Sequence, residues 1–530
     1  MRAFWADLWR RRWFRWAFAP VAAITVIWCC ICLILNYVGE IRWQKVKARL
    51  EAEGETFDYF ALLPPPIPDE QNFCAIEALN GIRAAEGPSE IAIFGKKKRD
   101  EINRQSAFLE PKDRMLISIN PLYEAVPPDD HVILSGLGRK GVSVLGKDRP
   151  PKSWLEVRTE LEKNAPVLIE LCQAVRRRPH AEHLPRPAPH ELPRPLMRMS
   201  FEQLTVCQPL SDLVRLYALA CLRCDDVRTS LDASLVLLRI AQAADSNRSL
   251  LGNLVAATHQ TQFHSLLWLY LEGRHFDDAS LVFVQQELQR FDPATQHLAS
   301  LRSELALSVD TYDYLQAHPV ERWNMLGSAS DLVSSASIGK PVALLSVVMP
   351  GGIFSLSKAS DVELMCDGII KPLRNQGLRH FETEITRVHA LLQASTAWKR
   401  PDLLLAKMSV PTFALIHRMV ILHESQHRQA LLACALERHF LRHASYPAVL
   451  EALDPEFLAG LNLLGVNGEK MHYQHTSGGR YRLWSVGPDG VDNGGKFGSE
   501  VVNGARGRTP SHPQYLGDWV WRYEPAVDKP

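Results

Sequence analysis

The sequence lacks an excess of charge of either sign. Its 530 residues carry 60 Lys and Arg against 59 Asp and Glu, so no net field draws the chain toward nucleic acid or an acidic partner. A disulfide framework is also missing, because three of the ten cysteines lie within 29–32 and the others are scattered. These absences exclude a basic nucleic-acid binder and a small disulfide-stapled domain. The length and the 46% hydrophobic content predict two to four domains with cores.

Long hydrophobic runs are absent as well, with one exception. From Trp16 to Leu35 every residue is apolar or small except Thr25. At about 1.5 Å per residue, such a helix spans the roughly 30 Å hydrocarbon core of a bilayer. Tryptophans precede the run, and Tyr37 and Trp43 follow it, as is typical of the two headgroup layers. We therefore predict a transmembrane helix at 16–38. The alternative is a cleaved signal peptide, but no small-x-small cleavage site follows the run.

The basic residues on the two sides of the span differ little in number. Five arginines precede it within 1–15, and four Lys or Arg follow it within 42–49. This bias, with a large body behind the span, favours a cytoplasmic segment at 1–15. The prediction is a single-pass protein of the cytoplasmic (inner) membrane whose body is extracytoplasmic, in the periplasm. The membrane is therefore the first predicted partner.

The segments after the span change character several times. We predict a juxtamembrane helix and a Pro-rich spacer within 39–69, because Pro64, Pro65, Pro66 and Pro68 interrupt the helical pattern of 40–62. A mixed region at 70–178 and a Pro-rich linker at 179–200 follow. GxGxxG at 136–141 is followed by a strand pattern and not by the helix that a dinucleotide site requires. Neither a nucleotide nor a nucleic acid is expected as a ligand.

A helical array is predicted at 201–405, since apolar residues recur at helical spacing after residue 210. The expected helices are 227–245, 250–272, 277–290 and 293–316, the last with Asp292 as cap and Pro293 in its first turn. The region 406–530 combines a long helix at about 411–443 with strands at 471–475, 481–486 and 518–523. The predicted fold is mainly α, with a transmembrane helix, a helical-array body and a small C-terminal α+β module with an antiparallel sheet.

One motif hints at catalysis. His423, Glu424 and His427 match HExxH, in which two histidines one helical turn apart bind zinc and the glutamate polarises a water molecule. The sequence supplies no glycine-bearing extension with a third histidine. Both histidines share a stripe with Val420 and Leu431, so packing inside the core is the simpler interpretation. A zinc metallopeptidase is kept as an alternative, with Glu424 as its catalytic residue and zinc as its cofactor.

A second motif concerns oxygen ligands. Glycine and aspartate are concentrated at 487–495, and carboxylates with freely turned carbonyls suit Ca²⁺. On composition Asp492 is a candidate calcium ligand. The competing interpretation is a solvated hairpin turn, because Asp and Gly favour turns without any ion. No cofactor is expected apart from this candidate calcium.

The C-terminal region resembles the C-terminal domain of type II secretion major pseudopilins. The residues that carry the resemblance are a long helix, YPAVLEAL at 446–453, YRLWSVGPDG at 481–490 and GDWVW at 517–521. In that family the loop holds calcium, so the resemblance implies Asp489 and Asp518 as carboxylate ligands. The insertion at 496–514 departs from the family pattern. About 370 residues separate the span from this module, which excludes an ordinary pilin subunit.

The whole architecture resembles a family of bacterial single-span, membrane-anchored proteins, which implies extracytoplasmic placement and no particular activity. We therefore expect an anchored interaction or scaffold protein that binds protein partners and has no catalytic site. A pseudopilin-like component of a secretion apparatus is the further alternative. An exposed groove on 200–320 would favour the scaffold.

Overall fold

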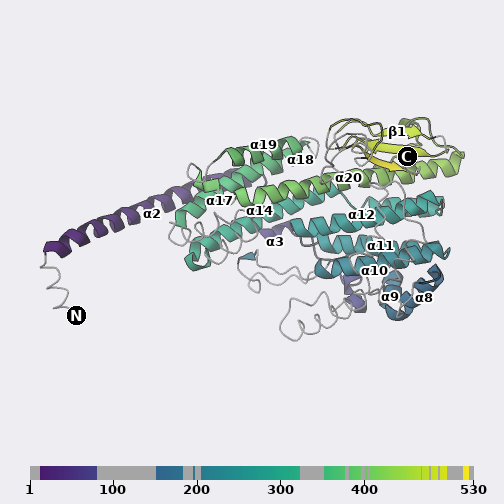
Figure 1. Ribbon diagram of the computed structural model, residues 1–530, viewed down its shortest axis with the longest axis horizontal. Coiled ribbons are helices and arrows are strands. Elements are labelled where there is room, and N and C mark those ends of the chain that lie inside the picture. Colours follow the sequence, from purple (N-terminus) through teal and green to yellow (C-terminus); the bar gives the residue numbers. More distant parts are fainter. Residues whose placement is uncertain are drawn as a thin grey trace.

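The computed structural model describes most of the chain. The described residues are 12–79, 151–182, 195–196, 204–322, 351–376, 381–395, 400–403, 406–466, 468–476, 479–487, 490–497 and 517–523. The fold is mainly α with one small antiparallel sheet, as predicted (Figure 1). The GxGxxG motif at 136–141 lies outside the described residues.

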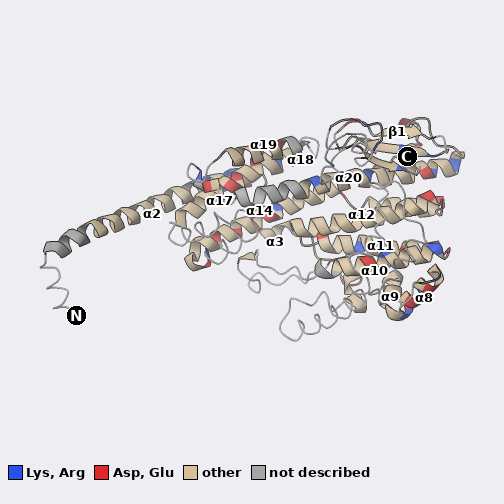
Figure 2. Cartoon of the chain, in the orientation of Figure 1, with Lys and Arg blue, Asp and Glu red and all other residues tan. Residues whose placement is uncertain are grey.

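Helix α2 (Arg12–Ala52) is the longest element and projects away from the body (Figure 1). Residues 16–39 carry no charge, and in Figure 2 the coloured part of this segment, from Pro20 on, is drawn in tan without blue or red. Its apolar side chains are exposed, for example Leu33 at 69%, and the segment from Pro20 is long and apolar enough to cross a membrane. Beyond Glu40 the same helix enters the body, where Trp43, Val46 and Leu50 are buried.

Two expectations about this region need correction. The helix ends at Ala52 and does not reach residue 62, because Gly54 turns the chain with φ +88° before the short helix α3 (Tyr59–Leu62). Trp43 does not lie free in a headgroup layer, since it is 5% exposed and packs beneath the Lys358 ammonium. Its place in the sequence suited a lipid anchor, but its side chain belongs to the core of the body.

The centre of the body is a stack of long helices. Their bounds are α8 (Trp154–Asn164), α9 (Val167–Val175), α10 (Leu204–Arg223), α11 (Val227–Asp245), α12 (Leu250–Glu272), α13 (Asp278–Leu288), α14 (Pro293–Ala317) and α20 (Ala406–His443). Successive helices α10, α11 and α12 pack side by side, and α20 covers α12 and α13 (Figure 1). The 3-10 turn η1 (Phe73–Ala75) joins the same core, and Asn72 forms a parallel bridge with His180.

Helix starts follow the capping rules. Asp226, Ser249, Asp277 and Asp292 each accept a hydrogen bond from a backbone N–H in the first turn of α11, α12, α13 and α14. Pro293 occupies the first turn of α14, where its missing N–H removes no helical bond. These local signals explain why the array helices lie where the sequence places them.

A second helical layer receives the end of the anchor helix. It consists of α17 (Gly351–Met365), the π-helical turn η4 (Cys366–Ile370), α18 (Lys371–Gln376), α19 (Phe381–Ala394) and the 3-10 turn η6 (Pro401–Leu403). Trp43, Val46 and Leu50 of α2 share one hydrophobic cluster with Ile369 of η4 and Val388 of α19.

The sheet lies beside the C-terminal half of α20 (Figure 1). Strands β1 (His472–His475), β2 (Tyr481–Ser485) and β3 (Trp519–Arg522) pair antiparallel in that order, after the 3-10 turn η7 (Leu450–Ala452). Gln429 of α20 donates to the Trp519 carbonyl at 2.7 Å, and Trp268 of α12 donates to the Arg522 carbonyl at 2.9 Å. The sheet is therefore fixed to both helices.

Candidate functional site

The junction between α2 and α17 depends on glycine. A Cβ atom on Gly352 would lie 2.2 Å from the backbone of Leu35, and one on Gly39 would lie 2.6 Å from the Gly352 carbonyl oxygen. The two backbones therefore touch where the apolar segment meets the body. Such close crossings need small residues, because any side chain would force the helices apart. The neighbouring Gly351 has no such constraint, since its nearest contact would be at 3.5 Å.

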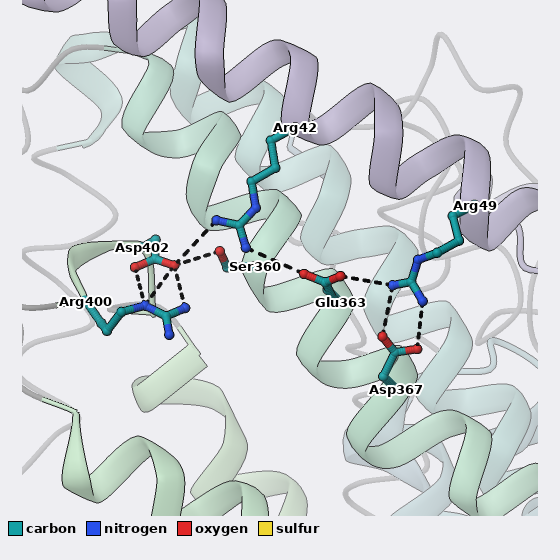
Figure 3. A network of polar contacts seen from close by, with 7 residues as sticks. All are labelled: Arg42, Arg49, Ser360, Glu363, Asp367, Arg400 and Asp402. Atoms are coloured by element: carbon teal, nitrogen blue, oxygen red, sulfur yellow. Dashed lines mark hydrogen bonds and ion pairs between the residues drawn. The ribbon is translucent and has the colours of Figure 1, made fainter.

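Charged side chains continue the junction beyond this crossing (Figure 3). Arg49 donates to Asp367 at 2.9 Å and to Glu363 at 3.2 Å. The hydrogen bond to Asp367 raises the pKa of Arg49. Arg42 lies 3.5 Å from the same Glu363. The anchor helix is thus tied to α17 and η4 by two arginines two turns apart, which lie on one face of a helix.

The network extends to the turn η6. Asp402 accepts hydrogen bonds from Ser360 at 2.7 Å and from Arg400 at 2.8 Å, and it lies 3.9 Å from Arg42 (Figure 3). A cleft of about 270 Å³ opens beside these groups, and Arg387 and Leu391 of α19 also line it. The π turn η4 contributes to the lining; turns of this kind are often found at functional sites.

A buried carboxyl group lies behind the network. Tyr312 of α14 donates a hydrogen bond to Asp361 of α17, and burial raises the pKa of Asp361 to about 8. At neutral pH this carboxyl is largely protonated, which removes the need for a buried counter-charge. No motif in the sequence pointed to it, since an aspartate in a helix is ordinarily exposed.

The HExxH residues of α20 lie deep in the body. His423 and His427 are each 3% exposed, and Glu424 is 6% exposed. His423 is within hydrogen-bond distance of Gln260 of α12, at 3.0 Å, and Glu424 accepts from Arg428 at 2.6 Å. This arrangement does not present the motif to a peptide substrate. The zinc peptidase stays a prediction, and the packing of α20 gives it no support.

A third histidine joins these two, and the sequence analysis missed it. The ring centroid of His264 on α12 lies 5.6 Å from that of His423 and 5.5 Å from that of His427. Among the described residues, neither ring nitrogen of His264 has a hydrogen-bond partner, and those of His427 have none of normal geometry. Burial lowers the pKa of His423 to about 3 and that of His427 to about 4, and it holds the pKa of His264 well below its usual value.

The candidate calcium ligands hold the 490–497 loop against the sheet. Asp518 accepts hydrogen bonds from the backbone N–H groups of Asn493 at 2.9 Å and Gly495 at 2.8 Å. Asp492 accepts from Trp484 at 3.0 Å and from the Gly494 N–H at 2.9 Å. Asp489 lies outside the described residues, so the set implied by the resemblance is incomplete here. The hydrogen bonds of Asp492 and Asp518 already organise the loop. Calcium binding stays a prediction.

All ten cysteines are free thiols, including Cys221 and Cys224 of α10. Comparisons of the chain with protein-family models, with curated proteins and with solved structures find no match.

Proposed function

We propose that this protein is a membrane-anchored scaffold, whose helical body is held in a fixed pose at the extracytoplasmic face of the cytoplasmic membrane and presented to protein partners. One observation carries the proposal: α2 runs as a single helix from an exposed apolar segment into the core of the body. A helix that is apolar on every side and yet unburied needs lipid around it.

The junction supports a fixed pose over a flexible tether. A simple anchor needs only a span and a linker, whereas α2 is packed through Trp43, Val46 and Leu50 and tied by Arg42 and Arg49. Arg42 follows Leu35 by seven residues, so the network lies roughly 10 Å beyond the apolar segment along the helix. That distance corresponds to the headgroup layer, and it sets the body directly on the membrane surface.

The test compares three forms of the full-length chain in membranes. They are the wild type, the double variant Arg42→Glu/Arg49→Glu and the variant Glu424→Gln, each with a photo-cross-linker at the exposed position of Val320. We expect all three to need detergent for extraction. The wild type and Glu424→Gln should cross-link the same proteins, and the double variant should lose those products because its body is no longer held in place.

Each arm of this experiment can fail separately. Release of the wild type by alkaline carbonate without detergent would refute the anchor. Unchanged cross-links in the folded double variant would refute the fixed pose. Intact proteins cross-linked by Glu424→Gln, where the wild type yields only fragments of them, would instead favour the peptidase alternative, because that change removes the general base and leaves substrate binding in place.

A pseudopilin-like role in a secretion apparatus is the second candidate. It is supported by the small antiparallel sheet beside the C-terminal half of α20, with Asp492 on the neighbouring loop and Asp518 directly before β3. If this loop binds calcium, a chelator should lower the melting temperature of the full-length protein, and the combined Asp492→Asn/Asp518→Asn variant should not respond. An equal melting temperature with and without Ca²⁺ in the wild type would remove the candidate.

A further inference from the structure

The last turn of α20 carries two histidines that the functional argument leaves unused. His439 and His443 are four residues apart, which places them one turn apart on the same face of the helix. Their ring centroids are 4.3 Å apart. Asp454, in the loop after η7, returns to this turn, and its Oδ2 atom lies 3.0 Å from His443 Nε2 and 3.8 Å from His439 Nδ1.

The three side chains bring their donor atoms together. One nitrogen from each ring and a carboxylate oxygen all lie within 4.8 Å of one another, and among the described residues this is the one group of three such side chains that meets that limit. Atoms that bind zinc at about 2.0–2.2 Å lie about 3–3.5 Å from each other. The two distances to Asp454, 3.0 and 3.8 Å, are close to this separation.

The burial of the cluster is graded from the core to the solvent. His439 is 8% exposed, and its Nδ1 atom is buried and makes no hydrogen bond to any described residue, although it faces Asp454. A buried ring nitrogen without a partner is unfavourable, and a ligand at this point would satisfy it. The side chain of His443 is 42% exposed and that of Asp454 is 29% exposed, which leaves a path for an ion and its water.

We propose that His439, His443 and Asp454 bind one divalent transition-metal ion, such as Zn²⁺, with water in the remaining positions. Two imidazoles and one carboxylate suit this class of ion, whereas Ca²⁺ and Mg²⁺ prefer oxygen ligands alone. The C-terminal end of a helix carries partial negative charge, which adds to the attraction. The ion would join the end of α20 to the loop that leads into the sheet.

A simpler interpretation is an ion-pair network without metal. Arg442 Nη1 lies 3.5 Å from the same Asp454 oxygen, and Arg442 also pairs with Glu456. This network accounts for the charge of Asp454 but not for the unbonded nitrogen of His439. The two interpretations differ in whether the purified chain takes up metal at this place.

The test uses the full-length protein in detergent after treatment with a chelator. Zn²⁺ is titrated by calorimetry and Co²⁺ by visible absorption, in the wild type, His443→Ala, Asp454→Asn and the control His389→Ala, a histidine on α19. Both altered ligands are partly exposed, so circular dichroism should show an unchanged fold. We expect one ion per chain, with affinity lowered about 10- to 100-fold or more in the two ligand variants and unchanged in the control.

Two outcomes would overturn the proposal. One is the absence of Zn²⁺ uptake by the wild type at micromolar concentration, which leaves only the ion-pair network. The other is uptake that His443→Ala and Asp454→Asn do not weaken, which places the ion at other histidines of the chain.

Discussion

The junction of α2 with α17 and the seam between α12 and α20 both join long helices, but they use polar groups in opposite ways. At the junction, Arg49 and Asp367 are charged and a little over one third exposed. In the seam, His264, His423 and His427 are buried and neutral. Charge can stay at the junction because each group has a partner and some water. In the seam it cannot, because burial of an unpaired charge is far more unfavourable.

This difference predicts that the stability of the two regions responds differently to salt and to pH. Partly exposed ion pairs are screened by salt, whereas neutral buried groups are not. Buried imidazoles respond to pH, since protonation would place a charge in the core. The steric contact at Gly352 should respond to neither. Three substitutions separate these contributions, and their expected effects on stability decrease from Gly352 through His264 to Arg49.

Gly352→Leu should have the largest effect. Its first side-chain atom would lie 2.2 Å from the Leu35 backbone, which cannot rotate away, so the anchor must separate from α17. We expect a loss of about 3 kcal/mol in the free energy of unfolding and new protease cleavage between 40 and 52. Gly351→Leu is the matched control, because its nearest neighbour would be at 3.5 Å. Equal protease resistance in the two variants would contradict the close crossing.

The helices of the array could be predicted because their signals are local. The sequence placed helices at 227–245 and 250–272, and the structure has α11 at Val227–Asp245 and α12 at Leu250–Glu272. Caps such as Asp226 and Ser249 lie next to the residues they serve, so a single sequence contains them. The three strands were predicted within two residues at each end for the same reason.

The candidate sites could be predicted only in part, because their partners are distant in the sequence. The HExxH pattern marks His423 and His427, and the helical stripe predicts their burial, but nothing in α20 indicates His264, some 160 residues earlier. Arg49 and Asp367 are separated by 318 residues. His439 and His443 have ligand spacing, yet only the path of the chain after η7 brings Asp454 to them.

His264→Leu tests the seam. Burial keeps His264 neutral in the folded protein, whereas the unfolded chain binds a proton below a pKa of about 6.5. Above pH 6.5 the protonation of His264 therefore does not change the free energy of unfolding. Below pH 6.5 the free energy of unfolding falls as the pH is lowered, by about 1.4 kcal/mol per pH unit. The variant lacks this loss. Its free energy of unfolding minus that of the wild type should therefore be about 2 kcal/mol higher at pH 5 than at pH 7.5.

Urea unfolding at a series of pH values checks this prediction. The difference between wild type and variant removes the opposite contribution of buried acids such as Asp361, whose pKa of about 8 stabilises the folded chain at lower pH. His389→Leu controls for the loss of an imidazole outside the seam. Parallel pH profiles for the wild type and His264→Leu would show that His264 is protonated or solvated in the folded state, and the contrast between the regions would disappear.

Arg49→Met should have the smallest effect and a different signature. The change keeps an aliphatic chain of similar length and removes the pairs with Asp367 and Glu363, while Asp367 keeps Lys371 at 2.5 Å. Because these groups are partly exposed, we expect a loss of about 1 kcal/mol or less. Unfolding at about 0.05 M and at about 0.5 M salt should show the loss shrinking as salt screens the wild-type pairs. A loss that does not change with salt would mean that Arg49 acts through packing of its stem, and the junction would then resemble the seam in depending on burial and not on charge.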